Sequence, residues 1–455
     1  MLTPAQLGKK IAVAPTTEPD ADQPEVTAEE QLSSDVFGQE SFARGTVGAR
    51  ALYRAWEGDP CISIDSPPGG GKTTLIVDLA CRLALHMRGQ VIVATPTNAA
   101  MFDIACRIGA KMKAYSEAYK KMTGKNAPPL IASLGNKATP YWVTQRADYE
   151  PSHISDRHSG PTPEGAVVVS VMTVASARMS ARSADVLIVE EAYQTTFSDI
   201  ATAAARIPQI IMVGDPGQIG PVIPIDTTAW DTVTYPPSKR APEVFKTFPD
   251  VARFSLPSTY RLGKATSRAI APLYDFTFDS QRPDTYIDGR AEIEVLDLEG
   301  VESPSERVVA ETAIGRADAL VGQPCARVDG STSTVTAADV VLIASRNEQV
   351  SLMTSLLALR PHHERFRVGT ADSLQGGQWL AAISIDPLLG LSEIASAHSV
   401  EKGRLCVMTS RHQAHLTFIT STDVGLVEGV DADNILVRQN LREEAKKGEV
   451  RHVAL

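Results

Sequence analysis

The stretch that decides the fold of this chain is SPPGGGKTT, residues Ser66 to Thr74. A short apolar run of strand length, Cys61 to Asp65, precedes it, and apolar residues at helical spacing follow from Leu75 to Met87. Glycines let consecutive backbone N–H groups point at phosphates, and the N-terminus of the following helix adds its positive dipole end. A strand, a glycine-rich loop and a helix in this order predict a binding loop for the phosphates of a nucleoside triphosphate.

The same pattern predicts roles for individual loop residues. Lys72 is expected to reach the β- and γ-phosphates, and the Thr73 hydroxyl is expected to bind Mg²⁺. The other loop residues expected to line the nucleotide are Pro68, Gly69, Gly70, Gly71 and Thr74. The first position of such a loop is usually glycine and is Ser66 here. A glycine- and proline-rich turn that binds nothing is the alternative, but the strand and the helix on either side argue against it.

The composition describes a protein of two or three domains. The chain has 455 residues, of which 43% are hydrophobic, and no run approaches the roughly 18 apolar residues that a membrane helix needs. The N-terminus lacks the basic and apolar segments of a secretory signal, so we expect a cytoplasmic protein with no membrane partner. The five cysteines are scattered, which predicts reduced thiols and neither a disulfide framework nor a zinc site.

The formal net charge of −10 is concentrated at the N-terminus. Residues 1–40 hold eight acids and two lysines, a net of −6, which leaves −4 for the other 415 residues. This acidic head predicts a disordered tail that could contact a protein partner. The nearly neutral remainder still allows a local basic groove for nucleic acid.

Apolar strands alternate with helical segments along the rest of the chain. In the first half, strands are expected at 91–95, 166–171, 186–189 and 210–213, with helices at 41–56, 99–113, 173–181 and 197–205. In the second half, strands are expected at 293–296, 340–344, 366–368, 380–385, 405–408 and 416–420, with helices at 305–320, 348–359 and 440–455. This alternation predicts doubly wound parallel α/β domains with ligand groups at the carboxyl ends of the strands.

Four segments follow from this pattern. We expect a disordered acidic tail over 1–40, a first α/β domain over 41–235, a second over 236–435, and a C-terminal tail or helix over 436–455. Residues from about 108 to 163 break the alternation and predict a small insertion in the first domain.

Polar residues at two strand ends suit hydrolysis of a γ-phosphate. Glu190 is expected to hold Mg²⁺, and Glu191 to orient and deprotonate the attacking water. Gln218, which follows the next strand, can bond to the γ-phosphate or the water. Arg261 and Arg411 are the candidates for positive charge in the transition state. Taken alone, the carboxylates could be a sheet rim and the arginines ordinary surface residues.

Seven segments resemble the motifs of superfamily 1 helicases in their order along the chain. They are Ser66–Thr73, Thr95–Asn98, Glu190–Gln194, Gly214–Pro221, Tyr260–Arg261, Thr370–Gly376 and Thr409–Arg411. The forms GDPGQI at 214–219, QG at 375–376 and TSRH at 409–412 are similar to the 5′→3′ branch. That branch includes the RNA-surveillance-type helicases and the helicases of alpha-like RNA viruses. The resemblance covers roughly residues 60–425.

The resemblance implies two tandem RecA-like domains and further site residues. Arg261 and Arg411 are similar to arginine fingers, and Tyr260 to a residue that stacks on the adenine. Gln375 and Gly376 occupy nucleotide-site positions, while Asn98, Thr173 and Thr370 occupy positions that grip the nucleic-acid backbone. The segment at 108–163 falls where the family inserts a stalk or wedge. Two departures are Glu190 in place of the usual aspartate and Gln378 where a glutamate often binds the ribose.

Lysines gather with tyrosines in the same segment. Lys111, Lys113, Lys120 and Lys121 are expected to contact nucleic acid, with Tyr115 and Tyr119 one helical turn apart among them. From the residues alone, a solvated helix with two half-buried tyrosines is the favoured alternative, and the resemblance shifts the interpretation toward nucleic acid.

Three hypotheses follow. We favour an ATP- and Mg²⁺-dependent translocase or helicase on single-stranded nucleic acid, moving 5′→3′ and preferring DNA to RNA. The second is an ATPase switch that nucleic acid stimulates and that remodels a complex while unwinding little. The third, a structural module with a degraded site, conflicts with the nearly complete set of catalytic residues.

Overall fold

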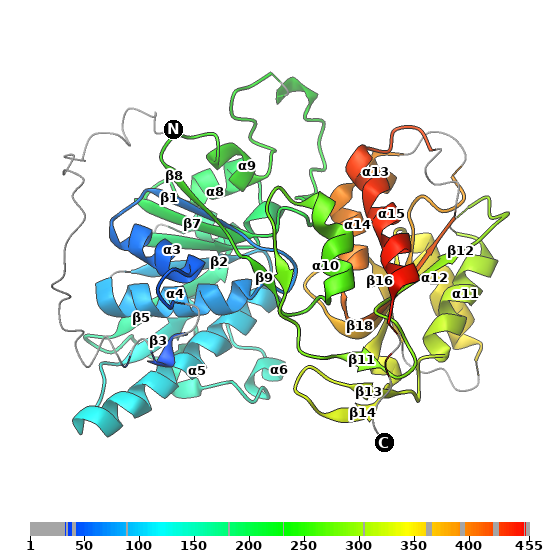
Figure 1. The fold of residues 1–455 in the computed structure, drawn as a ribbon. Helices are drawn as coiled ribbons and strands as arrows, with labels where there is room; N and C mark the ends of the chain where they lie inside the picture. The colour runs from blue at the N-terminus through cyan, green and yellow to red at the C-terminus, as the bar shows by residue number, and fades with distance from the viewer. Residues whose placement is uncertain are drawn as a thin grey trace. The chain divides into compact units, whose positions relative to one another are not determined.

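The computed structural model describes residues 32, 35–38, 42–87, 90–180, 183–230, 232–303, 305–360, 366–391, 396–421, 427–449 and 451. They form two α/β units, each containing its own large parallel sheet (Figure 1). Unit 1 extends to residue 255, except that 66–70 and 215–220 cluster with the residues from 256 onward in unit 2. The predicted α/β class with tandem parallel sheets is therefore confirmed.

Unit 1 is organised on an eight-stranded sheet with the order β4-β3-β5-β2-β6-β7-β1-β8, in which all neighbours run parallel. The strands are β1 (Cys61–Asp65), β2 (Val91–Thr95), β3 (Leu130–Ser133), β4 (Ile154–Ser155), β5 (Val167–Thr173), β6 (Val186–Glu190), β7 (Gln209–Gly214) and β8 (Val251–Ser255). β1, β2, β6 and β7 are buried along their whole length, as their continuous apolar sequences require in a sheet covered on both faces.

The helices of unit 1 are α3 (Val47–Trp56), α4 (Lys72–Met87), α5 (Asn98–Thr123), α6 (Tyr141–Thr144), α7 (Val174–Met179), α8 (Phe197–Ala203) and α9 (Ala241–Phe245). Residues of α7, α8 and α9 pack in one cluster with alternate residues of the central strands, such as Leu187 and Val189. α5 was predicted to end near residue 113, but nothing in its sequence breaks the helix before Gly124. That glycine ends it in the left-handed conformation, with φ 71°.

Three strands of unit 1 were not predicted. β3 and β4 lie within residues 108–163, so the segment expected to form an insertion supplies edge strands to the main sheet. β8 pairs with β1 in parallel, and unit 1 therefore continues past the expected boundary at residue 235. All three strands are short or only partly buried, which weakens their signal in the sequence.

The tail predicted over residues 1–40 is too long, because part of this segment is packed in the fold. The Phe37 ring is fully buried and stacks on Tyr115 with 5.3 Å between ring centroids. Arg82 donates to the Phe37 carbonyl at 2.8 Å, and Lys111 donates to the Val36 carbonyl at 3.0 Å. Residues 35–38 are therefore packed on unit 1, while residues 1–31, which hold most of the predicted acidic tail, lie outside the described residues.

Unit 2 contains a five-stranded parallel sheet with the order β12-β18-β17-β15-β16. Its strands are β12 (Ile293–Asp297), β15 (Val340–Ala344), β16 (Arg367–Thr370), β17 (Trp379–Ile385) and β18 (His412–Thr420). Smaller strands are β9 (Ser258–Thr259), β10 (Asp279–Ser280), β11 (Tyr286–Ile287), β13 (Pro324–Ala326) and β14 (Thr332–Thr334). The helices are α10 (Lys264–Ile270), α11 (Arg307–Asp318), α12 (Asn347–Ala358), α13 (Ala397–Val400), α14 (Lys402–Thr409) and α15 (Ala432–Lys447).

Helices cover both faces of this sheet. Leu342 and Ala344 of β15 share a cluster with residues of α11 and α12, whereas Val341 and Ile343 share a cluster with residues of α14 and α15. Because successive strand residues point to opposite faces, the two clusters are the two sides of one sheet. Unit 2 is thus doubly wound, as predicted.

One predicted strand of unit 2 is wrong. Residues 405–408 form part of helix α14 and not a strand, and the described residues of this helix from Gly403 to Thr409 are all buried. A short, fully buried apolar run has no periodicity that distinguishes a strand from a helix. The sequence pattern therefore predicted a strand where a helix forms. The C-terminal helix, expected from residue 440, begins at Ala432 because the Asp431 side chain caps it. Throughout the described part of the chain, every helix is too short or too polar to cross a membrane.

Candidate functional site

The loop between β1 and α4 has the backbone of an anion-binding turn. Gly69 and Gly71 adopt positive φ angles of 72° and 84°, which residues with a side chain rarely adopt. The Gly70 amide donates to the Pro67 carbonyl at 3.1 Å, and α4 begins directly afterwards at Lys72. The loop is therefore followed at once by the unpaired N–H groups of the first turn of a 16-residue helix.

Ser66 fits its unusual position because Gly70 leaves room for it. Ser66 is fully buried, and its hydroxyl donates to the Pro67 carbonyl at 3.0 Å. A Cβ atom added at Gly70 would lie 2.4 Å from this hydroxyl oxygen. The serine is thus accommodated inside the loop without disturbing Lys72 or Thr73.

Thr73 and Glu190 meet behind the loop. The Thr73 hydroxyl donates to Glu190 Oε1 at 2.9 Å, while Glu190 Oε2 is buried with no hydrogen-bond partner. Burial, and then the neighbouring Glu191, raise the pKa of the Glu190 carboxyl to about 7. A hydroxyl beside an unsatisfied carboxylate oxygen fits a divalent cation, whose charge would offset both causes. Among the described residues no cluster of three or more Asp, Glu, His or Cys forms a cage. Proteins commonly hold Mg²⁺ through one or two carboxylates and substrate phosphates.

Glu191 is held in a strained backbone conformation. It is the one non-glycine with positive φ, 49°, in the described part of the chain. Such conformations cost on the order of 1–3 kcal/mol and cluster at functional sites. Its Oε1 lies 3.7 Å from Lys72 Nζ, and its Oε2 is buried without a hydrogen-bond partner. The predicted water-orienting carboxylate and the predicted phosphate-binding lysine therefore lie together.

Sequence reasoning missed a polar cluster at the end of β1. Asp65 precedes the loop directly and accepts a hydrogen bond from the Tyr193 hydroxyl at 2.9 Å. Lys246 donates to the Tyr193 hydroxyl at 2.6 Å and also pairs with Asp65. The cluster ties the start of the loop to the turn that carries Glu190 and Glu191. In the sequence, Asp65 and Tyr193 could be noticed because they lie in or beside the recognised motifs. Lys246 could not, because it lies far from both in the chain.

A second group of predicted residues comes together within unit 2. Arg411 is almost fully buried, and its Nη2 lies 3.3 Å from Gln218 Oε1. Gln375 donates to the same oxygen at 3.5 Å, and Gln218 itself donates to Asp215 at 2.7 Å. This arrangement links the predicted γ-phosphate sensor, Gln218, to a predicted arginine finger.

The other predicted nucleotide-site residues of unit 2 are less buried. Arg261 donates through Nε to Gln378 Oε1 at 3.0 Å, so the second arginine candidate bonds to the residue found where a glutamate was expected. Tyr260 is 57% exposed. Gly376 is exposed and has a positive φ of 85°.

The residues expected to grip a nucleic-acid backbone lie at strand ends. Asn98 is exposed and is the first residue of α5. Thr173 ends β5 and caps α7 by accepting from the Ser176 amide at 3.2 Å, and it pairs in register with Thr95 of β2. Asn98 and Thr173 therefore share one edge of the unit 1 sheet. Thr370 ends β16 in unit 2 and accepts from the Ser373 amide at 3.2 Å.

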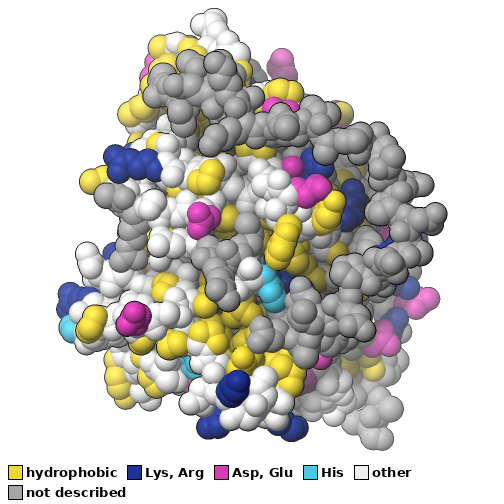
Figure 2. All heavy atoms as spheres, turned by 90° about the vertical axis from the view of Figure 1, so that its left-hand side faces the viewer, with side chains coloured by type: hydrophobic (Ala, Val, Ile, Leu, Met, Phe, Trp, Pro, Cys, Tyr) yellow, Lys and Arg dark blue, Asp and Glu magenta, His cyan; other side chains and the backbone are white. Residues whose placement is uncertain are grey.

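The lysines of α5 divide into two pairs. Lys111 pairs with Asp78 at 3.1 Å, and Lys113 pairs with Glu150 at 2.9 Å. Lys120 and Lys121 are exposed in the last turn. Tyr115 is part of the core and does not present a stacking face to solvent. On the face drawn in Figure 2, basic and acidic side chains are interspersed among hydrophobic ones in the coloured part.

Comparisons with known proteins find one family model, one curated relative and several solved structures that match part of this chain. Residues 49–229 match the family of AAA domains. Regulator of nonsense transcripts 1 of Caenorhabditis elegans is 25% identical in an alignment 185 residues long, which covers 36% of this chain and 17% of that protein. The helicase of PRRSV is 15% identical, with a TM-score of 0.40, and the match covers 82% of this chain and 54% of that one. An arterivirus nonstructural protein 10 (helicase) in complex with DNA is 15% identical, with a TM-score of 0.42, over 87% of this chain and 66% of that one. The chain thus spans about a sixth of the curated relative and less than two thirds of either viral protein.

Proposed function

We propose that this chain, which resembles superfamily 1 helicases of the branch that includes the regulator of nonsense transcripts, hydrolyses ATP to move along single-stranded nucleic acid. The observation that carries the proposal is the group of four side chains behind the loop. Thr73 bonds to Glu190, and Lys72 lies 3.7 Å from Glu191. These contacts bring together Lys72, which can bind phosphate, the pair Thr73 and Glu190, which can hold a metal ion, and Glu191, which can act as a general base. The four residues lie at the start of α4 and at or directly after the end of β6. From the motif forms we further propose 5′→3′ movement, and from the alanine-rich composition we propose DNA and not RNA as the substrate.

Each residue has a distinct task in this mechanism. Lys72 offsets negative charge on the β- and γ-phosphates, and Glu191 accepts the proton of the attacking water. Mg²⁺, when bound beside Thr73 and Glu190, supplies further neutralisation of the phosphate oxygens. Gln218 orients the water or senses the γ-phosphate, and Arg411, which bonds to it, adds positive charge where the transition state becomes more negative. Arg261 is the second residue proposed for that task.

A second candidate is an ATPase switch that nucleic acid stimulates and that unwinds little. It is favoured by the ion pairs of Lys111 and Lys113, because these reduce the cationic surface left on α5 for tracking a strand. The acidic residues before 32, outside the described part, remain the proposed contact for a protein partner.

ATP turnover with and without single-stranded DNA or RNA tests the proposal. Lys72→Ala and Glu191→Gln are expected to abolish turnover, and Glu191→Gln should leave nucleotide binding largely intact because it keeps the shape of the side chain. Glu117→Gln, an exposed carboxylate on α5, is the matched control. Turnover that persists in Glu191→Gln contradicts the assignment of the base. Strand displacement on tailed duplexes then separates a helicase from a switch, and the tail polarity that supports it tests the direction.

A further inference from the structure

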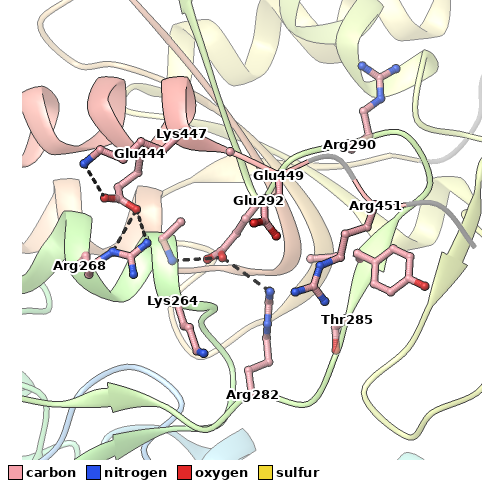
Figure 3. A pocket seen from close by; sticks show the side chains of 14 residues that line it. Lys264, Arg268, Arg282, Thr285, Arg290, Glu292, Glu444, Lys447, Glu449 and Arg451 are labelled. Atoms are coloured by element: carbon pink, nitrogen blue, oxygen red, sulfur yellow. Dashed lines mark hydrogen bonds and ion pairs between the residues drawn. The ribbon is translucent and has the colours of Figure 1, made fainter.

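Unit 2 contains a pocket that shares no residue with the nucleotide loop or with the cluster around Arg411. It encloses about 360 Å³ and is lined by α10, the segment from Arg282 to Glu292, Ala414 of β18, the end of α15 and Arg451 (Figure 3). Elements from three separate parts of unit 2 thus converge on it. Its size is within the range of small-ligand sites.

The lining of this pocket is strongly cationic. Its basic residues are Lys264, Arg268, Arg282, Arg290, Lys447 and Arg451, against the three carboxylates Glu292, Glu444 and Glu449. The surplus of three positive charges stands in a chain whose net charge is −10. Cations concentrated around one cavity repel one another unless an anion joins them.

Two of the three carboxylates already have structural partners. Glu444 accepts from Arg268 Nε at 3.0 Å and from Lys447 at 3.4 Å. Glu292 accepts from the Thr266 amide at 3.0 Å and from the Thr266 hydroxyl at 2.6 Å, and so holds the start of α10. These carboxylates are therefore occupied in fixing helices, and they neutralise the other cations only in part.

Arg282 and Arg451 extend toward each other across the pocket (Figure 3). The Arg282 side chain is only 11% exposed, and its guanidinium lies 3.7 Å from Glu292. Burial lowers the pKa of Arg282, and the nearby Arg451 lowers it further, although Glu292 acts against both. Arg290 makes one long bond of 3.4 Å to the Ala319 carbonyl. Arg451 also pairs with Asp284, outside the lining, at 2.7 Å, and Arg282 also donates to the Gln413 carbonyl. A guanidinium has five N–H donors, so both arginines keep N–H groups that suit phosphate oxygens.

We propose that this pocket binds a phosphate-bearing anion with more than one negative charge, held chiefly by Arg282 and Arg451, while Lys264 and Arg290 add positive charge to the lining. The ligand is either a free polyphosphate group or a phosphate of a nucleic-acid backbone. The proposal does not depend on the proposed ATPase activity.

The test is titration calorimetry of the full chain with inorganic tripolyphosphate, with the nucleotide loop saturated by a non-hydrolysable ATP analogue. A parallel titration uses a single-stranded oligonucleotide. The variants are Lys264→Ala/Arg290→Ala and Lys447→Ala, and the matched control is Lys446→Ala, which removes the neighbouring exposed lysine of α15 that does not line the pocket. Arg282→Gln is a third variant, interpreted only where its unfolding transition matches that of the unaltered chain.

We expect the double variant to bind its phosphate ligand at least about tenfold more weakly, since it loses two of the positive charges of the lining. A loss confined to tripolyphosphate identifies a free polyphosphate, and a loss confined to the oligonucleotide identifies a backbone phosphate. Equal affinities for both probes in the double variant and in Lys446→Ala overturn the proposal. Because both substituted side chains of the double variant are at least partly exposed, the fold is expected to survive the change.

Discussion

Replacement of Gly70 by alanine tests how tightly the nucleotide loop is built. The new Cβ would lie 2.4 Å from Ser66 Oγ, where ordinary contacts begin near 3.4 Å, so the buried Ser66 side chain and the loop that carries it have to give way by about 1 Å. Gly70, unlike Gly69 and Gly71, has no positive φ, so alanine adds little backbone strain of its own. A displacement of about 1 Å near reacting groups costs on the order of 10² in rate. We therefore expect kcat/KM for ATP to fall by about 10²-fold in Gly70→Ala.

The double variant Ser66→Gly/Gly70→Ala makes this prediction specific. Removing the serine hydroxyl removes the 2.4 Å contact, while the two contacts of 3.1 Å with Pro67 remain, so activity should recover in part. Ser66→Gly alone is the control for loss of the serine. Steady-state ATP hydrolysis measures the rate, and a fluorescent nucleotide measures binding. The steric reasoning is refuted if Gly70→Ala keeps kcat/KM within about threefold, or if the double variant is no more active than Gly70→Ala.

Three other predictions concern unit 2. Arg411→Ala should lower ATP turnover by roughly 10³-fold with its circular dichroism unchanged, as expected for an arginine finger, and a mild effect contradicts that role. Arg438→Met should lower the free energy of unfolding in urea by about 3–5 kcal/mol. The substitution leaves the fully buried Asp386 carboxylate without its ion pair, in which Arg438 Nη2 lies 2.7 Å from Asp386 Oδ1. An unchanged urea midpoint would contradict this. Burial opposes ionisation of Asp339, but hydrogen bonds from Arg327 and its own helix cap outweigh it and lower the pKa of Asp339 to about 2. A lowered pKa stabilises the fold above the unfolded value of about 3.9, so the stability advantage over Asp339→Asn should shrink as pH falls from 4 to 2. If urea titrations show a stability difference between the unaltered chain and Asp339→Asn that stays constant from pH 4 to pH 2, the proposed effect of the Arg327–Asp339 pair is wrong.

The central strands and the loop could be predicted because their signals are local. β1 and β2 were predicted with their observed bounds, since fully buried parallel strands are continuous apolar runs between polar turns. The meeting of Thr73 with Glu190 follows from the same logic, because the parallel strands β1, β7 and β6 bring their carboxyl ends to one edge of the sheet. Where the signal is local and the sheet parallel, the sequence predicts the strands and the loop between them.

The errors arose where tertiary packing decides the structure. Residues 405–408 are apolar enough for a strand, but they lie in a helix that is buried on all sides. β8 was missed because Arg253 interrupts it, and its pairing with β1 spans almost two hundred residues. Lys246 likewise reaches Asp65 and Tyr193 only through the fold. No window of sequence contains such pairs, and propensity is too weak to replace them.

The lysines of α5 show why charge in a sequence does not identify a binding surface. Lys111 binds the Val36 carbonyl and Asp78, and thereby holds the N-terminal segment whose Phe37 fills the core. Its positive charge serves folding, since removing it would leave a buried carboxylate without its ion pair. Lys120 and Lys121 lie in the last turn of the helix and are exposed to solvent, and neither forms an ion pair with another described residue. A nucleic-acid contact on this helix is therefore expected at its C-terminal end, and substitutions there should weaken binding without lowering the stability of unit 1.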